Sequence, residues 1–453
     1  MKKFIRYICL ILFCAVILSA GVFAVQPSAG LQIKSEAAVL MDGDTSQVLF
    51  EKNMNEKLYP ASITKIMTAL LALEKCKLTD TVTMSHDAVF SIGSDSSSIA
   101  LDAGEKITLE QALYALAIAS ANDAANGIAE LVSGSMDDFA NLMTSKAKEL
   151  GALNTNFVNA HGLPDESHYT TAYDIARITM SAVKIPEFIK IFGTVSYEMP
   201  PTNKQKETRY LNRQNSMLTG GFKYDGVIAE KTGWTGDAGY TYMAAAKRNG
   251  RTLIAVVMKS KTEADRWADA GAMFDYGFDG LTPVSYGANE FGKKQYAIKC
   301  ADGNKIYTDL VPDGDFKCLI PKSLNKNNID VAYIFTVNST DCNITCKAVF
   351  SLKSGVSPAA YSELGEMNLQ VHIDENNLPE SINMITDTGQ IQKTGSSVLS
   401  KIFSAISLIL EIIGVIAVIL LILYIRRNMI IQKRKKRRLT YNKTNADKTS
   451  AYK

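Results

Sequence analysis

Histidine is scarce in this chain of 453 residues, which contains only four. Cys342 and Cys346 have the close spacing of some metal ligands, but a zinc site needs further cysteines or histidines around such a pair. No histidine pair lies near these two cysteines in the sequence. We therefore expect no metal site and no cofactor.

Cysteine is also sparse, with seven residues in all. Four of them lie in the second half of the chain, at Cys300, Cys318, Cys342 and Cys346. If the chain is exported, an oxidising environment permits disulfides among them. Four cysteines allow three pairings, and the sequence does not choose among these.

The body of the chain lacks an excess of positive charge. Of the 49 lysines and arginines, three lie within residues 1–24 and 11 lie from Arg426 onward. One of the 46 acidic residues also lies in that last segment, so 45 acidic and 35 basic side chains remain between. Nucleic-acid binding needs a basic surface, and we therefore expect no nucleic-acid partner.

The sequence shows no internal repeats and no sign of global disorder. Hydrophobic residues make up 47% and charged residues 21% of the chain, which is enough to form a substantial core. A length of 453 residues exceeds one ordinary domain. It indicates two domains with additional segments at the ends.

Residues 1–24 have the order of a secretory signal. Three basic residues are followed by an apolar run from Tyr7 to Leu18 and then by small residues that end at Ala24. We expect cleavage after Ala24. The alternative is an N-terminal membrane anchor that is retained.

Residues 402–425 form an apolar segment long enough to cross a bilayer as a helix. Beyond Glu411 the segment has no polar face, which favours a transmembrane helix over the alternative, an amphipathic helix on the membrane surface. Residues 426–453 are basic and therefore predicted to be a cytoplasmic tail. The sequence thus predicts a single-pass protein of the cell membrane. Its body lies on the extracytoplasmic side, and a linker over 391–401 joins it to the membrane.

Residues 30–282 carry the pattern of a mixed domain. The run Ala37–Phe50 predicts two strands around a turn, Pro60 begins a strongly apolar helix, and further strand-like runs follow from Ile228. This order predicts an α+β fold with helices packed on an antiparallel sheet. Residues 283–390 instead contain short alternating segments, which predict a small all-β domain.

Two helix boundaries are marked by their capping residues. Thr108 and Gln111 have the spacing of a capping box and predict the start of a helix. A second helix, from Ala264 to about Phe278, is expected to end at Gly280.

The first motif with chemical content is Ser62-Ile63-Thr64-Lys65. Residues three apart share a helix face, so the Lys65 amine can reach the Ser62 hydroxyl. A serine needs a neighbouring base to become a nucleophile, and a lysine can be that base if burial lowers its pKa. Because the same spacing is common in ordinary helices, this motif alone is a weak signal.

Two further motifs follow along the chain. Ser120-Ala121-Asn122 places a hydroxyl and an amide two residues apart. Lys231-Thr232-Gly233 places a cation and a hydroxyl beside a glycine that allows close approach, as a carboxylate-binding edge requires. Each motif alone could be an ordinary polar segment. In this order, however, S-x-x-K, S-x-N and K-T-G form a known catalytic set for acyl transfer.

With these motifs the chain resembles the low-molecular-mass penicillin-binding proteins, the serine-type D-Ala-D-Ala carboxypeptidases with a serine β-lactamase-like fold. The resemblance covers about residues 30–282 and continues more weakly beyond them. It depends on the stretches 59–68, 120–125, 157–163, 170–174 and 231–233. There are two mild departures. Thr144 stands where the family has asparagine, and Trp234 is bulkier than the usual residue.

The resemblance implies catalytic roles for four residues. Ser62 attacks the carbonyl between the last two D-alanines of a peptidoglycan stem peptide and forms an acyl-enzyme. Lys65 is the base for this attack. Ser120 relays a proton to the leaving amine, and Asn122 holds the substrate amide and Lys65.

The resemblance also implies how substrates are held. The expected substrate-binding residues are Lys231, Thr232, Gly233 and Trp234. Lys231 and Thr232 bind the terminal carboxylate, and the backbone N–H groups of Ser62 and Trp234 form the oxyanion hole. β-Lactam antibiotics are expected to acylate Ser62 as substrate mimics. His161 is interpreted as structural, because Lys65 already supplies the base.

Three other functions share some of these features. A β-lactamase carries the same motifs, but the loop 157–164 lacks the glutamate that assists deacylation in that class. A D,D-endopeptidase that cuts cross-links is compatible with all three motifs. An inactive wall-binding scaffold is the third alternative, and the intact Ser62 and Lys65 argue against it.

Overall fold

The computed structural model describes residues 31–93, 95–213, 216–291, 295–300, 305–337, 344–353, 363–373 and 384–386. The predicted signal (1–24), linker (391–401), transmembrane helix (402–425) and cytoplasmic tail (426–453) lie outside these residues and stay predictions. Among the residues described, no helix combines the length and the apolar character that a membrane crossing requires.

The described residues fall into two compact units. The first contains the described residues up to Gln295, together with Asp309–Tyr333 and Lys347–His372. The second contains described residues of Tyr296–Thr308 and Ile334–Cys346 and those from Ile373 onward. All residues of the three chemical motifs belong to the first unit.

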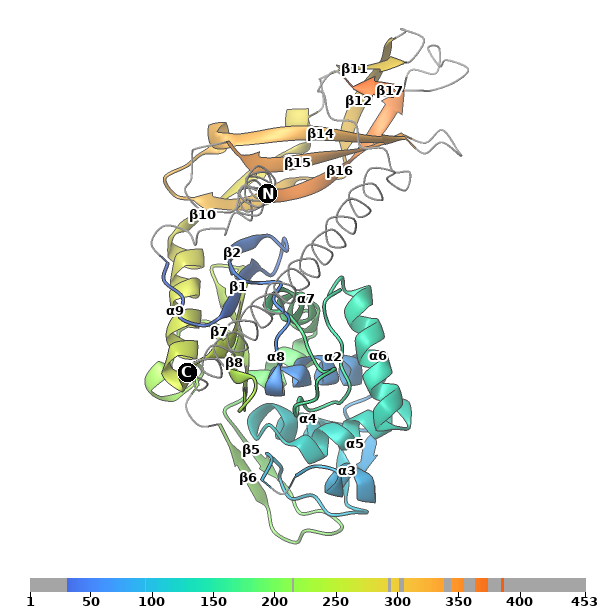
Figure 1. The fold of residues 1–453 in the computed structure, drawn as a ribbon, viewed down its shortest axis with the longest axis vertical. Coiled ribbons are helices and arrows are strands. Elements are labelled where there is room, and N and C mark those ends of the chain that lie inside the picture. Colours follow the sequence, from blue (N-terminus) through green and yellow to red (C-terminus); the bar gives the residue numbers. More distant parts are fainter. Residues whose placement is uncertain are drawn as a thin grey trace, which may run out of the picture. The chain divides into compact units, whose positions relative to one another are not determined.

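A five-stranded antiparallel sheet forms the centre of the first unit, in the order β2-β1-β9-β8-β7. Figure 1 labels β1, β2, β7 and β8 of this sheet. The strands are β1 (Ala37–Asp42), β2 (Val48–Lys52), β7 (Val227–Thr235), β8 (Gly239–Arg248) and β9 (Arg251–Ser260). Along β1, Val39 and Leu40 belong to two different buried hydrophobic clusters, and Val256 and Val257 of β9 do the same. Because neighbouring residues of a strand face opposite sides, both faces of the sheet are covered. Strand β7, which carries the third motif, lies at an edge.

Helices cover both faces of this sheet. The larger cluster contains residues of α2 (Lys65–Lys75), α4 (Leu109–Ile118), α5 (Asn122–Ser133), α6 (Met136–Glu149), α7 (Ala172–Ala182) and α8 (Pro186–Phe192). The smaller cluster contains Trp267 and Phe274 of α9 (Glu263–Asp279), which ends at Gly280 as predicted. The α+β prediction is therefore confirmed.

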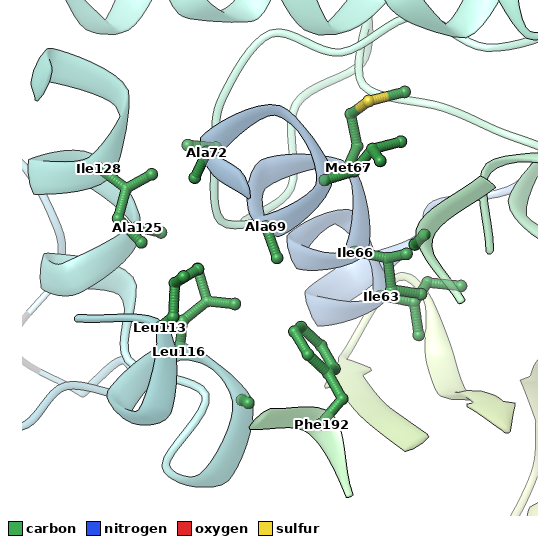
Figure 2. Packing of buried hydrophobic residues seen from close by; sticks show 14 of the residues in the cluster. Ile63, Ile66, Met67, Ala69, Ala72, Leu113, Leu116, Ala125, Ile128 and Phe192 are labelled. Atoms are coloured by element: carbon green, nitrogen blue, oxygen red, sulfur yellow. The ribbon is translucent and has the colours of Figure 1, made fainter. Parts of the chain in front are cut away.

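Helix α2 is enclosed by its neighbours, as the apolar sequence after Pro60 predicts. Figure 2 shows Leu113 of α4, Ile128 of α5 and Phe192 of α8 around it. All three side chains are fully buried or nearly so. This packing fixes the position of the helix whose first residue is Lys65.

Short elements complete the first part of the chain. These are β3 (Thr81–Thr83), α3 (His86–Phe90), β4 (Lys106–Thr108), β5 (Ser196–Met199), β6 (Arg209–Asn212) and the 3-10 helix η2 (Gly220–Phe222). The predicted capping box begins α4. Thr108 Oγ1 accepts from Gln111 N at 3.2 Å, and Thr108 N donates to Gln111 Oε1 at 2.7 Å.

After Gly280 the described residues form mainly strands. They are β10 (Leu281–Tyr286), β11 (Gln295–Cys300), β12 (Lys305–Pro312), β13 (Phe316–Pro321), β14 (Ile329–Val337), β15 (Ile344–Leu352), β16 (Glu363–Ile373) and β17 (Met384–Thr386), with α10 (Ala288–Phe291) and the 3-10 helix η3 (Lys326–Asn328). The Gln47 side chain bonds β13 as a strand partner would: Nε2 donates to Leu319 O at 2.8 Å, and Oε1 accepts from Leu319 N at 2.7 Å. Cys318 and Cys346 are both buried free thiols, so they do not form a disulfide with each other.

Candidate active site

Ser62 lies in a 3-10 turn, η1 (Ala61–Thr64), immediately before α2. The predicted helix at Pro60 therefore begins with a tighter turn than an α-helix. Ala61 has a φ of 49°, a left-handed conformation that is unfavourable for an L-residue with a side chain. Pro60 O accepts a hydrogen bond from Thr241 Oγ1 of β8 at 2.9 Å, which ties this turn to the sheet.

The Lys65 side chain is fully buried, and its amine makes three contacts. Nζ lies 2.9 Å from Ser62 Oγ, 2.6 Å from Asn122 Oδ1 and 2.7 Å from the backbone oxygen of His161. Asn122 Oδ1 and His161 O can only accept. A neutral amine has two hydrogens, which these acceptors take, so its lone pair is left for the Ser62 hydroxyl proton. This arrangement is that of a base poised against a nucleophile.

The pKa of Lys65 is consistent with that role. Burial disfavours the charged ammonium and lowers the pKa to about 7, while the negative charge of Asp123 opposes this effect. A lysine with such a pKa is neutral in a substantial fraction of molecules at neutral pH. It can therefore accept a proton without a metal or a histidine.

Ser120 lies in the turn between α4 and α5, which we call the α4–α5 turn (Ala119–Ala121). Ser120 has a φ of 56°, another left-handed residue that is not glycine. Asn122 begins α5 and sends its side chain to Lys65. Ser120 Oγ instead accepts from Lys231 Nζ at 3.0 Å, so this turn connects the first and third motifs.

Lys231 lies on the edge strand β7, and its side chain is also fully buried. Its Nζ donates to Ser120 Oγ and, at 2.8 Å, to Thr232 O. Burial lowers the pKa of Lys231 well below its usual value, and the positive charges of Lys65, Arg213 and Arg266 lower it further. An anion bound here would relieve that repulsion.

Gly233 places β7 directly against the nucleophile. A Cβ at this position would lie 2.8 Å from Ser62 N and would clash with Thr241 Oγ1. Only glycine therefore permits this approach of strand and turn. The next residue, Trp234, pairs with Tyr240 of β8, and its side chain is 59% exposed.

The segment 157–164 packs against the turn Ala61–Thr64, which carries Ser62 and which we call the nucleophile turn. Ala160 O accepts from Thr68 Oγ1 at 2.6 Å, next to the contact of His161 O with Lys65. Gly162 has a φ of 91°, and a Cβ there would clash with Ala61 O. His161 thus contributes its backbone carbonyl rather than its ring, in agreement with its interpretation as structural.

Comparison with known proteins agrees with this geometry. Residues 22–262 match the family model described as D-alanyl-D-alanine carboxypeptidase, Peptidase_S11. The D-alanyl-D-alanine carboxypeptidase DacF of Bacillus subtilis (strain 168) is 37% identical over 302 residues, which cover 65% of this chain and 75% of that protein.

The chain belongs to this family.

Two solved structures are also similar to this carboxypeptidase family member. Penicillin binding protein 5 from Haemophilus influenzae has a TM-score of 0.58 at 27% identity, covering 75% of this chain and 97% of that one. The Streptomyces K15 DD-transpeptidase has a TM-score of 0.52 at 30% identity, covering 55% of this chain and 98% of that one. The chain is thus a low-molecular-mass penicillin-binding protein of the serine-type D-Ala-D-Ala carboxypeptidase family, as its motifs predicted.

The structure brings the predicted site residues of this carboxypeptidase together. Direct contacts join Ser62, Lys65 and Asn122, and a second set joins Ser120 and Lys231. Gly233 connects the two sets, because it lies against Ser62 N. Thr232 is half-buried and accepts from Lys231 through its backbone oxygen, and Trp234 is the most exposed of the predicted residues. The roles assigned to these residues stay predictions.

Sequence reasoning missed three groups around the site. Arg266 of α9 is buried, and its Nη1 lies 3.4 Å from Gly233 O. His168 is buried beside the first motif, where Nε2 lies 2.9 Å from Thr64 Oγ1 and Nδ1 accepts from Val158 N at 3.1 Å. Asp123 follows Asn122 directly. Its position beside the second motif was the available signal, whereas Arg266 lies 35 positions after Lys231 and had none.

Proposed function

We propose that the chain hydrolyses the peptide bond between the last two D-alanines of peptidoglycan stem peptides, through an acyl-enzyme on Ser62. Membership of the D-alanyl-D-alanine carboxypeptidase family supports this reaction. The single observation that carries the mechanism is the set of contacts of Lys65 Nζ with Ser62 Oγ and two acceptors.

In the first step, Lys65 takes the proton of the Ser62 hydroxyl while Oγ bonds to the carbonyl carbon of the penultimate D-alanine. The carbonyl oxygen becomes negatively charged. In this proposal the backbone N–H groups of Ser62 and Trp234 stabilise it as the oxyanion hole. The close approach of Gly233 to Ser62 N supports this, because it brings the two segments that carry these donors side by side.

In the second step, the C–N bond breaks and the leaving amine receives a proton. Ser120 relays it from Lys65, and Lys231 supports this role because its donation to Ser120 Oγ leaves the hydroxyl hydrogen free to point to another acceptor. Free D-alanine departs. A water molecule then attacks the ester with Lys65 again as base, which releases the shortened peptide and restores Ser62.

The carboxylate of the terminal D-alanine is assigned to Lys231 and Thr232. The Lys231 ammonium has three donors, and the structure gives acceptors for two of them. The third donor and the buried positive charge are then available for the carboxylate. A charge-assisted hydrogen bond of this kind contributes about 1.5–3 kcal/mol.

The test is to incubate the full-length chain with diacetyl-Lys-D-Ala-D-Ala and to measure free D-alanine. We expect release by the wild type and none by Ser62→Ala. The same two proteins treated with a fluorescent penicillin should show covalent labelling of the wild type alone. Absence of D-alanine release and of labelling would favour the inactive scaffold, and labelling that survives in Ser62→Ala would remove Ser62 from the mechanism.

Two assays separate the remaining hydrolytic alternatives. Sustained, fast turnover of nitrocefin would indicate a β-lactamase, whereas one slow equivalent of acylation supports the carboxypeptidase. A cross-linked muropeptide dimer distinguishes a D,D-endopeptidase, which would cut it to monomers. We expect the pentapeptide to be the better substrate.

Acyl transfer to an amine is a second candidate function. The likeness to a solved structure named DD-transpeptidase favours it, since the same acyl-enzyme on Ser62 can be attacked by an amine instead of water. Addition of D-leucine at millimolar concentration to the peptide assay tests this. Diacetyl-Lys-D-Ala-D-Leu among the products would show transfer, and diacetyl-Lys-D-Ala as the only peptide product would show hydrolysis.

We also propose that the chain is exported by residues 1–24 and anchored by residues 402–425, with its catalytic residues on the extracytoplasmic side. The sequence order of the signal and the basic residues 426–453 support this orientation. Protease added to spheroplasts should remove the region that carries Ser62 while leaving an epitope after Lys453 intact. Protection of both regions would reject the orientation.

A further inference from the structure

Asp123 is a buried carboxylate that the proposed reaction does not use. It is the second residue of α5, and only 1% of it is exposed. Its oxygens accept backbone N–H bonds from Ala124 at 2.9 Å, Leu101 at 3.0 Å and Ile99 at 3.2 Å. Burial raises the pKa of Asp123, and these hydrogen bonds, which replace water around the carboxylate, oppose that effect. They also connect two segments that lie apart in the sequence.

These bonds fasten the segment 97–101 to the start of α5. Asn122 N donates to Ser97 O at 2.8 Å, so two consecutive residues of α5 hold the same segment. Ala100 in that segment and Ser120 in the α4–α5 turn both have positive φ, at 54° and 56°. Left-handed residues with side chains are costly and persist only where their surroundings hold them. Asp123 provides part of that support beside the catalytic Asn122.

Asp123 also acts on Lys65 through its charge. Its negative charge favours the protonated amine and opposes the effect of burial on the Lys65 pKa. Among the residues that the structure describes, the other titratable groups that interact electrostatically with Lys65 are Lys231 on β7 and the rings of His161 and His168. These are a cation and two imidazoles, so none of them supplies a negative charge. Around Lys65, that charge comes from α5.

We propose that Asp123 is a positioning residue for acyl transfer: its carboxylate holds the 97–101 segment on α5 and is the buried counter-charge of the Lys65 amine. The inference rests on the proposed chemistry at Ser62. Asp123 itself does not touch the reacting groups, since its bonds are all to backbone N–H groups. It acts on them through Asn122 and Lys65.

The experiment measures the rate of acylation of the full-length chain by a fluorescent penicillin from pH 5 to pH 9. The rate falls at low pH as Lys65 becomes protonated. Asp123→Asn keeps the shape of the side chain but removes the charge, so Lys65 should lose its proton more easily. We expect the acid limb, the part of the pH–rate profile in which the acylation rate falls at low pH, to move to lower pH by about one unit. Weaker hydrogen bonds to the 97–101 segment should also lower the maximal rate of acylation, by about tenfold.

Asp174→Asn is the matched control. Asp174 is equally buried, lies in the first turn of α7 and accepts from Asn154 N and Thr155 Oγ1, but it is not coupled to Lys65. A general loss of stability would affect both variants, whereas the acid limb should move only in Asp123→Asn. An unmoved limb in Asp123→Asn, or an equal shift in Asp174→Asn, would overturn the inference.

Asp123→Glu keeps the negative charge but moves the carboxylate away from the backbone N–H groups of the 97–101 segment. This variant provides the test if Asp123→Asn does not fold. Asp123→Glu should have the same acid limb as the wild type and a lower maximal rate. An acid limb shifted as far as in Asp123→Asn would contradict the assignment of Asp123 as the counter-charge of Lys65. The penicillin assay does not require D-alanine release. Failure of the proposed function therefore shows in the wild type with peptide substrate, and failure of this inference shows in the position of the limb.

Discussion

Lys65 and Lys231 are both fully buried lysines in one active site, but their amines have different partners. Lys65 contacts a hydroxyl and two pure acceptors, which occupy every position of a neutral amine. Among the residues that the structure describes, Lys231 Nζ donates to one hydroxyl and one backbone oxygen, so the third N–H of its ammonium is available for a bound anion. The first arrangement suits a base, and the second suits a cation that binds an anion.

The surroundings behind the two lysines differ as well. On the Lys65 side lies the neutral His168, bonded to Thr64. On the Lys231 side lies the ion pair of Glu230 and Arg213, with Nη1 and Oε1 3.4 Å apart. Burial lowers the pKa of both lysines, so burial alone does not assign their roles. The number and kind of their hydrogen-bond partners support the proposed difference in role.

Lys65→Arg should give the largest effect on this comparison. Arginine keeps the positive charge but is not deprotonated in proteins, so it cannot act as the base. We expect acylation by a fluorescent penicillin to fall by about 10³-fold. Lys231→Arg is the control, because a permanent cation there still attracts the carboxylate. Equal losses in the two variants would show that the two lysines do not divide the work in this way.

Lys231→Gln should give the next largest effect. The amide can still donate to Ser120 Oγ but has no charge for the substrate carboxylate. We expect kcat/KM for diacetyl-Lys-D-Ala-D-Ala to fall by about 50-fold, mainly through KM. A peptide whose terminal carboxylate is amidated should be cleaved equally slowly by the wild type and the variant. If the variant discriminates between the free and the amidated peptide as strongly as the wild type does, Lys231 does not bind the carboxylate.

The pH dependence should show which lysine limits the reaction. Only the neutral form of Lys65 is active as a base, and burial lowers its pKa to about 7. We therefore expect kcat/KM to be high above pH 7 and to fall by about tenfold per unit below it. Steady-state rates from pH 5 to pH 8 measure this. A rate that rises on acidification through pH 7 would contradict the assignment of Lys65 as the base.

Replacement of His168 by glutamine should have the smallest effect on activity but a clear effect on stability. Burial lowers its pKa to about 4, while an unfolded histidine titrates near about 6.5. The native state therefore favours the neutral ring. The contribution of this ring to the unfolding free energy is fully present above pH 6.5 and is lost as the pH falls towards 4. The loss over this range is about 3 kcal/mol.

Urea unfolding at pH 7.5, 6 and 5 tests this expectation. His168→Gln should lower stability at pH 7.5 but should reduce the loss between pH 6 and pH 5. His86→Gln is the control, because His86 is an exposed residue of α3 that contacts Asp87. If the wild type and His168→Gln lose stability in parallel, the buried ring does not set the acid sensitivity of the fold.

Local patterns in the sequence predicted several features of the fold and of the candidate site. The period of the apolar residues after Pro60 identified a buried helix, and the S-x-x-K spacing already implied the contact of Ser62 with Lys65. The capping box of Thr108 and Gln111 depends only on local geometry, so it too was predictable.

Contacts made by the backbone were not predictable in this way. The carbonyl of His161 and the left-handed residues Ala61 and Ser120 have no signature in side-chain type. They result from the packing of distant segments against one another. Asp123 and His168 are similar, because their partners are backbone N–H groups or a hydroxyl far along the chain.

The close contact of Gly162 with the backbone of Ala61 has a practical consequence. Lys65 meets the His161 carbonyl only when this segment has docked on the nucleophile turn. Until then the Lys65 amine lacks one of its two acceptors, so we expect molecules without this docked segment to react more slowly with β-lactams. The rate of labelling by a penicillin dye should therefore follow the docking of residues 157–164 as the protein folds.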